Sequence, residues 1–194
     1  MFSQEVIAAI ATVRSTAKFL DLKNTDILVS NLAFMQQVIT ASERLLQEAA
    51  DESTGELREY YLNHLEEERD HEAWLADDLK SVGVDVKTLP MMRKAVEMAG
   101  SQYYLIKHVH PSSLLGYMAV LEGFPMPIDL VDLLENVHGK QLIRTLRYHA
   151  EHDVEHRKEL FKMIDKQARP EILMSAAQTA VYVNEFSQEL TKAQ

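Results

Sequence analysis

Apolar residues recur every three or four positions along almost the whole chain, which is the spacing of amphipathic helices. The pattern stops where a polar run, glycine or proline intervenes. Helices are therefore predicted over residues 3–20, 27–50, 54–81, 89–108, 111–122, 128–137, 140–167 and 171–191. No long linker or internal repeat interrupts them. The sequence thus predicts an all-α fold, a single domain over residues 1–194, built as a bundle of seven or so helices.

Local signals support the ends of two of these helices. Ser53 followed by Glu56 has the spacing of a capping box, in which each side chain satisfies the other's free backbone N–H. This pair predicts the start of the long 54–81 helix, and Gly83 predicts its end. Pro90 is expected in the first turn of the following helix, where a proline costs no hydrogen bond.

Composition narrows the classes of function. The chain has no cysteine, which excludes thiolate nucleophiles, disulfides and iron–sulfur clusters. Its net charge of −10 disfavours nucleic acid and anionic membrane surfaces as partners. No apolar run approaches the ~20 residues of a membrane helix, and the N-terminal apolar stretch lacks a basic flank. We therefore expect a cytoplasmic protein whose first segment is a helix and not a signal peptide.

The strongest chemical signal is a repeated triplet of histidine, acid and histidine, with spacing H-x3-[DE]-x2-H. One copy lies in each of the two long helices: His64, Glu68 and His71, then His149, Asp153 and His156. Positions separated by four and seven residues share one helix face, so each triplet forms a narrow stripe. Imidazole and carboxylate together suit iron, manganese or zinc. Two facing helices could thus present six ligands to two ions.

Glu122 is the candidate for a carboxylate that bridges the two ions. It is the only acid in the apolar stretch from residue 114 to 126, and it shares a helix face with Leu115, Met118 and Ala119. A carboxylate that points into a core is costly unless it is neutral or paired with a cation. Glu122 is therefore assigned both as a ligand and as the catalytic residue.

Other polar residues have simpler interpretations. A single histidine–acid pair on a helix is usually a weak surface pair, so it is the combination of two triplets with Glu122 that favours a metal. Glu66, Glu67, Arg69 and Asp70 are expected on the solvated flank of their helix. His152 could either be exposed to solvent or contact the metal ligands without binding the ion itself.

These motifs resemble a known family. Three motifs follow one another along the chain: His-x-x-Trp-Leu from His71, Leu-x-Gly-Tyr-x3-Leu-Glu-Gly ending at Gly123, and the second triplet. This order is similar to that in the haem-oxygenase-like diiron oxidases and oxygenases, the CADD-like group. The resemblance covers about residues 55–165. It implies a seven-helix fold shared with thiaminase-II-like proteins and pyrroloquinoline-quinone synthase.

The resemblance also implies a ligand set for two irons. By residue-to-residue match, the iron ligands are His71, Glu122, His149, Asp153 and His156. The family's first glutamate falls on His64 here. Either His64 replaces that carboxylate, or Glu68 or Glu67 supplies it. The absence of any histidine before His64 argues against a true haem oxygenase, and the lack of cysteine argues against the common thiaminase-II-like enzymes.

The sequence therefore predicts an oxidoreductase that uses two iron ions, or iron and manganese, to activate O2 and oxidise a small organic molecule. Small-molecule substrate and O2 are its expected partners, without nucleic acid or membrane, and a homodimer is compatible with the sequence. The alternative is a haem-oxygenase-like binding protein that holds no metal, or a single ion at His149, Asp153, His156 and Glu122.

Overall fold

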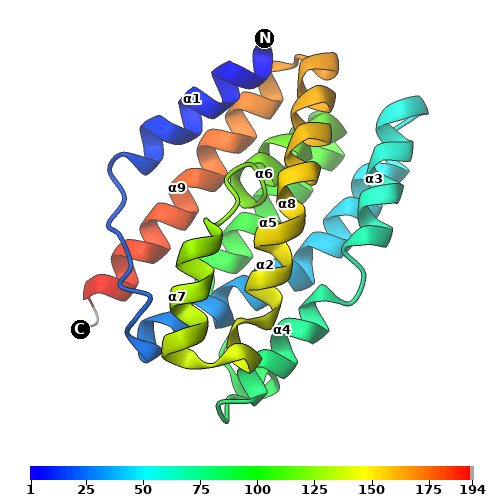
Figure 1. Ribbon diagram of the computed structural model, residues 1–194. Coiled ribbons are helices and arrows are strands. Elements are labelled where there is room, and N and C mark those ends of the chain that lie inside the picture. Colours follow the sequence, from blue (N-terminus) through cyan, green and yellow to red (C-terminus); the bar gives the residue numbers. More distant parts are fainter. Residues whose placement is uncertain (193–194) are drawn as a thin grey trace.

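The computed structural model describes residues 1–192, which form helices joined by short loops, with no strand among them. The helices pack as one elongated bundle (Figure 1). Their bounds are α1 Phe2–Arg14, α2 Thr25–Asp51, α3 Gly55–Glu67, α4 His71–Lys80, the 3-10 turn η1 Val86–Thr88, α5 Arg93–His108, the 3-10 turn η2 Pro111–Ser113, α6 Leu114–Leu121, α7 Ile128–His138, α8 Lys140–Gln167 and α9 Pro170–Lys192.

Two hydrophobic cores lie along the bundle. The larger one joins α1, α2, α3, α5, α6 and α9 with the C-terminal half of α8. The smaller one joins α2, α4 and α7 with the N-terminal half of α8. On α8 the second histidine triplet falls between the residues of the two cores, and the first triplet falls likewise between Tyr61 of α3 and Leu75 of α4. The two triplets thus form a polar layer between two apolar ones.

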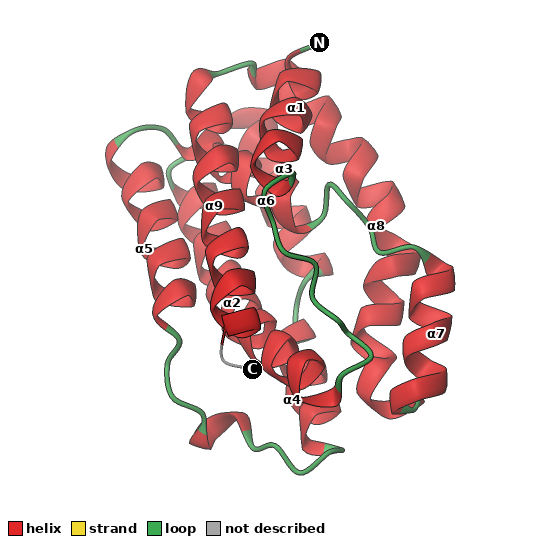
Figure 2. Cartoon of the chain, turned by 90° about the vertical axis from the view of Figure 1, so that its left-hand side faces the viewer, coloured by secondary structure: helices red, strands yellow, loops and turns green. Residues whose placement is uncertain are grey.

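Most of the predicted helices are present, with shifted ends. α8 has the expected bounds, α7 is one residue longer at its C-terminal end, and α9 is one residue longer at each end. The first helix stops at Arg14, well before residue 20, and an irregular segment follows to Asn24. Asn24 then caps α2, its side-chain oxygen accepting from the backbone N–H groups of Asp26 and Ile27. Figure 2 shows the segment between α1 and α2 running across the face of the bundle between α9 and α7.

The prediction of one continuous helix over residues 54–81 is wrong. The chain leaves the helix after Glu67 and re-enters it at His71, so α3 and α4 are separate. Asp70 has a left-handed backbone, with φ 67° and ψ 4°, which an α-helix cannot contain. Because α3 and α4 are the halves of one expected helix, the described residues hold more helices than the seven predicted.

Two of the expected helix starts are also corrected. Ser53 does not form a capping box with Glu56, since its hydroxyl donates to the carbonyl of Ala49 at 2.6 Å. The residue that precedes α3 is Thr54, which makes no side-chain cap. Pro90 lies outside a helix, because α5 begins only at Arg93.

The short helix α6 lies at the centre of the bundle and packs most closely on α9. Gly116 permits this contact, because a Cβ at this position would lie 2.1 Å from the carbonyl oxygen of Ile172 and 2.7 Å from the backbone nitrogen of Ala176. α6 therefore carries Glu122, which directly follows it, into the interior. Among the described residues, no helix is both long and apolar enough to cross a membrane.

Candidate metal centre

Four elements bring the predicted ligands together. α3 carries His64, and Glu68 and His71 flank the break before α4. Glu122 ends α6, and α8 supplies the second triplet. All seven predicted residues lie in one polar layer, in which six side chains form two clusters of three and Asp153 lies between them.

The first cluster consists of His64, Glu122 and His156, each with one potential ligand atom within 4.8 Å of those of the other two. Nε2 of His64 lies 3.1 Å from Oε1 of Glu122. The rings of His64 and His156 meet edge to face, with centroids 5.4 Å apart. Three residues from three helical segments thus converge on one point.

The second cluster consists of Glu68, His71 and His149, which meet the same criterion. Nδ1 of His71 lies 3.0 Å from Oε2 of Glu68, and the rings of His71 and His149 are 5.0 Å apart. His71 is buried, with 1% of its surface exposed. The break after α3 matters here, because it places Glu68 and His71 close together across a turn.

Two carboxylates contact residues of both clusters. Oδ1 of Asp153 lies 3.2 Å from Nδ1 of His149 and 4.0 Å from Nδ1 of His156. Glu68 has one oxygen on His71 and the other 4.0 Å from Nδ1 of His156. Glu122, the bridge expected from the sequence, makes its close contact with His64 alone. Asp153 and Glu68 therefore lie between the two clusters.

Several buried atoms of the two clusters have no hydrogen-bond partner among the described residues. These atoms are Oε1 of Glu68, Oε2 of Glu122, Nε2 of His149 and Nδ1 of His156. A buried polar atom without a partner costs free energy, so such groups are normally satisfied. The polar layer holds four such atoms, two carboxylate oxygens and two imidazole nitrogens. A metal cation bound among them would satisfy all four.

The charges of the layer are strongly coupled. Burial lowers the pKa of His64, but the charge of Glu122 and its hydrogen bond outweigh burial and raise that pKa to about 9. Burial raises the pKa of Glu68, but the hydrogen bond from His71 and the charge of His149 outweigh it and lower that pKa to about 2. The site therefore already stabilises positive charge among ionised carboxylates.

A cavity of about 930 Å³ adjoins the polar layer. Its polar wall includes His64, Glu68, Glu122, His149 and Asp153. The remaining wall is largely apolar, with Met35, Leu46, Met118, Leu121 and Leu146 among its residues. The volume suits a small organic molecule, which would contact the ligand residues directly.

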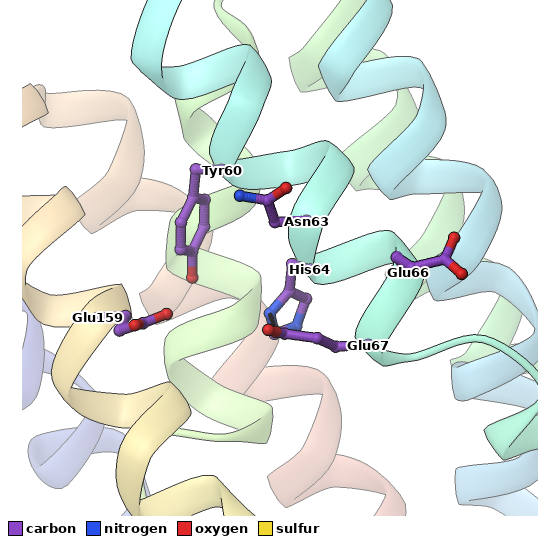
Figure 3. A pocket seen from close by; sticks show the side chains of 6 residues that line it. All are labelled: Tyr60, Asn63, His64, Glu66, Glu67 and Glu159. Atoms are coloured by element: carbon purple, nitrogen blue, oxygen red, sulfur yellow. Dashed lines mark ion pairs between the residues drawn. The ribbon is translucent and has the colours of Figure 1, made fainter.

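Two further residues lie at this site: Glu67, which the sequence left only as an alternative ligand, and Tyr60, which it did not single out. Oε2 of Glu67 lies 3.8 Å from Nδ1 of His64 and 3.7 Å from Nε2 of His156, although half of its side chain is exposed. Tyr60 stacks on His64 with ring centroids 6.0 Å apart, and its hydroxyl is buried without a partner. Figure 3 shows both beside the His64 ring. Tyr60 lies four residues before His64, a helical spacing that could have revealed it.

The other aromatic and histidine residues have supporting positions. Trp74 and Tyr148 pack against His71 and fix its ring, with centroids 4.4 and 5.1 Å from it. His152 stacks on Tyr148 at the surface and makes its hydrogen bond to a backbone carbonyl, so it belongs to neither cluster. Of the two positions that the sequence left open for His152, the structure therefore shows the solvent-exposed one.

Comparison with solved structures identifies the fold. A domain of unknown function from Shewanella denitrificans OS217, described as having a heme oxygenase-like fold, superimposes with a TM-score of 0.67 over 98% of this chain and 90% of that one, at 14% identity. The fold is haem-oxygenase-like. This confirms the predicted all-α class and architecture, while at such low identity the likeness concerns the fold alone. No family model and no curated protein matches the chain.

Proposed function

We propose that this protein binds two transition-metal ions at the two clusters and uses them with O2 to oxidise a small organic molecule held in the adjoining cavity. The observation that carries the proposal is the set of four buried, unpartnered ligand atoms in the polar layer. Their positions on two separate residue clusters favour two ions over one.

The donor atoms fit iron or manganese. They are imidazole nitrogens and carboxylate oxygens without any sulfur, a mixture that suits these metals. His64, Glu122 and His156 would hold one ion, and Glu68, His71 and His149 the other. Asp153 and Glu68 lie between the two groups and would link them.

The remaining residues would hold the substrate and exclude water. When bound, the metal pair would supply the reduction of O2, which no side chain of this chain can perform. The apolar wall of the cavity would place a carbon of the substrate beside the clusters. Trp74 and Tyr148 would keep the His71 ring oriented during turnover.

Anaerobic loading with Fe(II) tests the metal part of the proposal. We expect up to two ions per chain at saturation, measured by metal analysis after removal of free ion. His152→Ala is a matched control, because His152 lies on the same helix outside both clusters. Less than half an ion per chain in the parent protein would falsify the metal centre.

Reaction with O2 tests the oxidase part. The Fe(II)-loaded protein should consume O2 in an oxygen-electrode measurement, and Glu122→Ala should slow this at least tenfold, because the first cluster loses its carboxylate. A Glu122→Ala variant that consumes O2 at the parent rate would remove Glu122 from the reacting site.

The second candidate function is a binding protein without metal. It is favoured by the imidazole–carboxylate contacts of His64, His71 and His149, each of which pairs with an acid at 3.0 to 3.2 Å, so that these groups partly satisfy one another. Such a protein would bind an apolar compound equally well before and after treatment with a chelator. The metal-dependent protein would not retain O2 consumption after that treatment.

A further inference from the structure

We propose that metal ions reach the two clusters through an acidic hollow on the outer side of His64, and not through the apolar cavity. This inference rests on the metal binding of the proposed function. It assigns the loading route to Glu67, which the sequence left only as an alternative ligand, and to Glu159, to which the sequence assigned no role.

The hollow is a separate opening of about 390 Å³ on the surface of α3 and α8. It is lined by Tyr60, Asn63, His64, Glu66, Glu67 and Glu159 (Figure 3). His64 is only 4% exposed, so this opening gives its ring contact with the outside. His64 also lines the apolar cavity, and its side chain therefore separates the two spaces.

The carboxylate of Glu67 connects the hollow with the first cluster. It is half exposed, yet its Oε2 lies within 3.8 Å of imidazole nitrogens of both His64 and His156. An ion held by Glu67 would need to move only a few ångströms to reach these histidines. A carboxylate that contacts both solvent and ligands is suited to passing an ion inward.

Two groups at the rim would guide a hydrated cation toward Glu67. Glu159 is exposed and makes no ion pair among residues 1–192, so its charge is free to attract cations. The buried hydroxyl of Tyr60 has no hydrogen-bond partner and points toward Glu159 in Figure 3. Three carboxylates line the recess against a single imidazole, and although Glu66 also pairs with Arg69, such an excess of negative charge raises the local concentration of cations.

The apolar cavity is a poor route for the same ion. Away from the polar layer most of its wall is apolar and cannot replace the hydration shell, although Glu43 and several hydroxyl and amide side chains also line it. Arg14 and Lys18, which line it near the segment after α1, would repel a cation. The cavity is thus suited to the organic substrate and the hollow to the metal.

Stopped-flow mixing of metal-free protein with Co(II), followed by visible absorption, measures the loading rate. Glu159→Gln removes the charge at the rim, and Asn63→Trp obstructs the hollow without changing charge. Both sites are exposed, so these variants should fold. Glu155→Gln is the control for charge, because Glu155 lies on α8 paired with Lys158. Ala17→Trp narrows the apolar cavity instead.

We expect Glu159→Gln to load about three- to tenfold more slowly at low salt, with the difference shrinking at high salt. Asn63→Trp should be slow at any salt concentration. Both should reach the parent's Co(II) content at equilibrium, and Glu155→Gln and Ala17→Trp should load at the parent rate.

Parent-like rates in both hollow variants, or slow loading in Ala17→Trp alone, would overturn the route while leaving the metal centre intact. A parent protein that binds no Co(II) and no Fe(II) at equilibrium would overturn the metal centre and the route together. The stoichiometry thus separates the two failures.

Discussion

At the scale of single residues, His64 and Glu68 have the most informative positions. The sequence left open whether His64 or a nearby glutamate completes the first metal site. In the structure the two do not compete, because His64 lies with Glu122 and His156 while Glu68 lies with His71 and His149. The break after α3 separates them. Both residues can therefore serve as ligands at the same time.

Substitution of His64 gives a prediction about stoichiometry. His64→Ala should lower the Fe(II) content at saturation from two ions to one per chain, because the second cluster does not include this side chain. His64→Glu should restore two ions by supplying a carboxylate. Metal analysis across an Fe(II) titration decides the matter. If His64→Ala still binds two ions, His64 does not bind metal itself and only supports a ligand. Removal of such a supporting residue lowers the metal affinity by only ~10–100-fold.

The raised pKa of His64 predicts how the stability of the metal-free protein depends on pH. Its folded-state pKa of about 9 exceeds the ordinary histidine value of 6.5, so the stabilisation is complete below pH 6.5 and is lost as pH rises through 9. The loss should be on the order of 3 kcal/mol. Urea unfolding of chelator-treated protein between pH 6 and 10 measures it. His64→Gln should flatten this dependence, and an equally steep slope in the variant would assign the effect to other groups.

At the scale of secondary structure, the interruption between α3 and α4 is the main departure from the sequence pattern. The triplet spacing continues the helical period through residues 64–71, so the pattern itself gives no sign of a break. Asp70 tolerates the left-handed backbone that the turn requires. The turn lets Glu68 reach His71 and the second cluster, so the local irregularity serves the site.

Two glycines give a matched prediction about helix packing. Gly116→Ala should destabilise the fold by about 2–4 kcal/mol, because the added Cβ would meet the backbone of α9 at 2.1 Å. Gly100→Ala in α5 meets nothing within 4 Å, and it should stabilise the fold by about 0.5–1 kcal/mol through higher helix propensity. Urea midpoints measure both. If Gly116→Ala left the free energy of unfolding unchanged, α6 and α9 would be able to move apart without destabilising the fold.

At the scale of the whole molecule, the polar layer between two hydrophobic cores determines where chemistry can occur. Both cores are apolar, and the described clusters of potential ligands lie between them. The layer is open to the apolar cavity on one side and to the acidic hollow on the other. Substrate and metal could thus approach the same residues from different directions.

Metal binding should stabilise the entire bundle, because the ligands come from four elements, α3, α4, α6 and α8, that the ions would join. Mn(II) at about one hundred times its dissociation constant should add about 2.7 kcal/mol, which for a chain of this size raises Tm by roughly 5–10 °C. The rise should be larger at pH 8 than at pH 6, since the ion displaces protons from the histidines. Thermal unfolding with Mg(II) as the control ion measures it. An equal rise with Mg(II) would point to nonspecific binding.

The sequence by itself determined the helical class, most helix positions and the two triplets. These features depend on local spacing, since a 3.6-residue period and the residues at four- and seven-residue intervals can be read directly from the chain. α8 shows this best, because its bounds and its triplet were both predicted.

Only the tertiary structure decided how the ligand residues are shared between two clusters. Spacing shows which side chains share a face, but it does not show which oxygen meets which imidazole across helices. Asp153 and Glu68 lie between the clusters, and Glu122 lies against His64, because α6 and the break after α3 set their depth. The contact of half-exposed Glu67 with both His64 and His156 could not be read from the spacing for the same reason: Glu67 in α3 and His156 in α8 are 89 positions apart in the sequence.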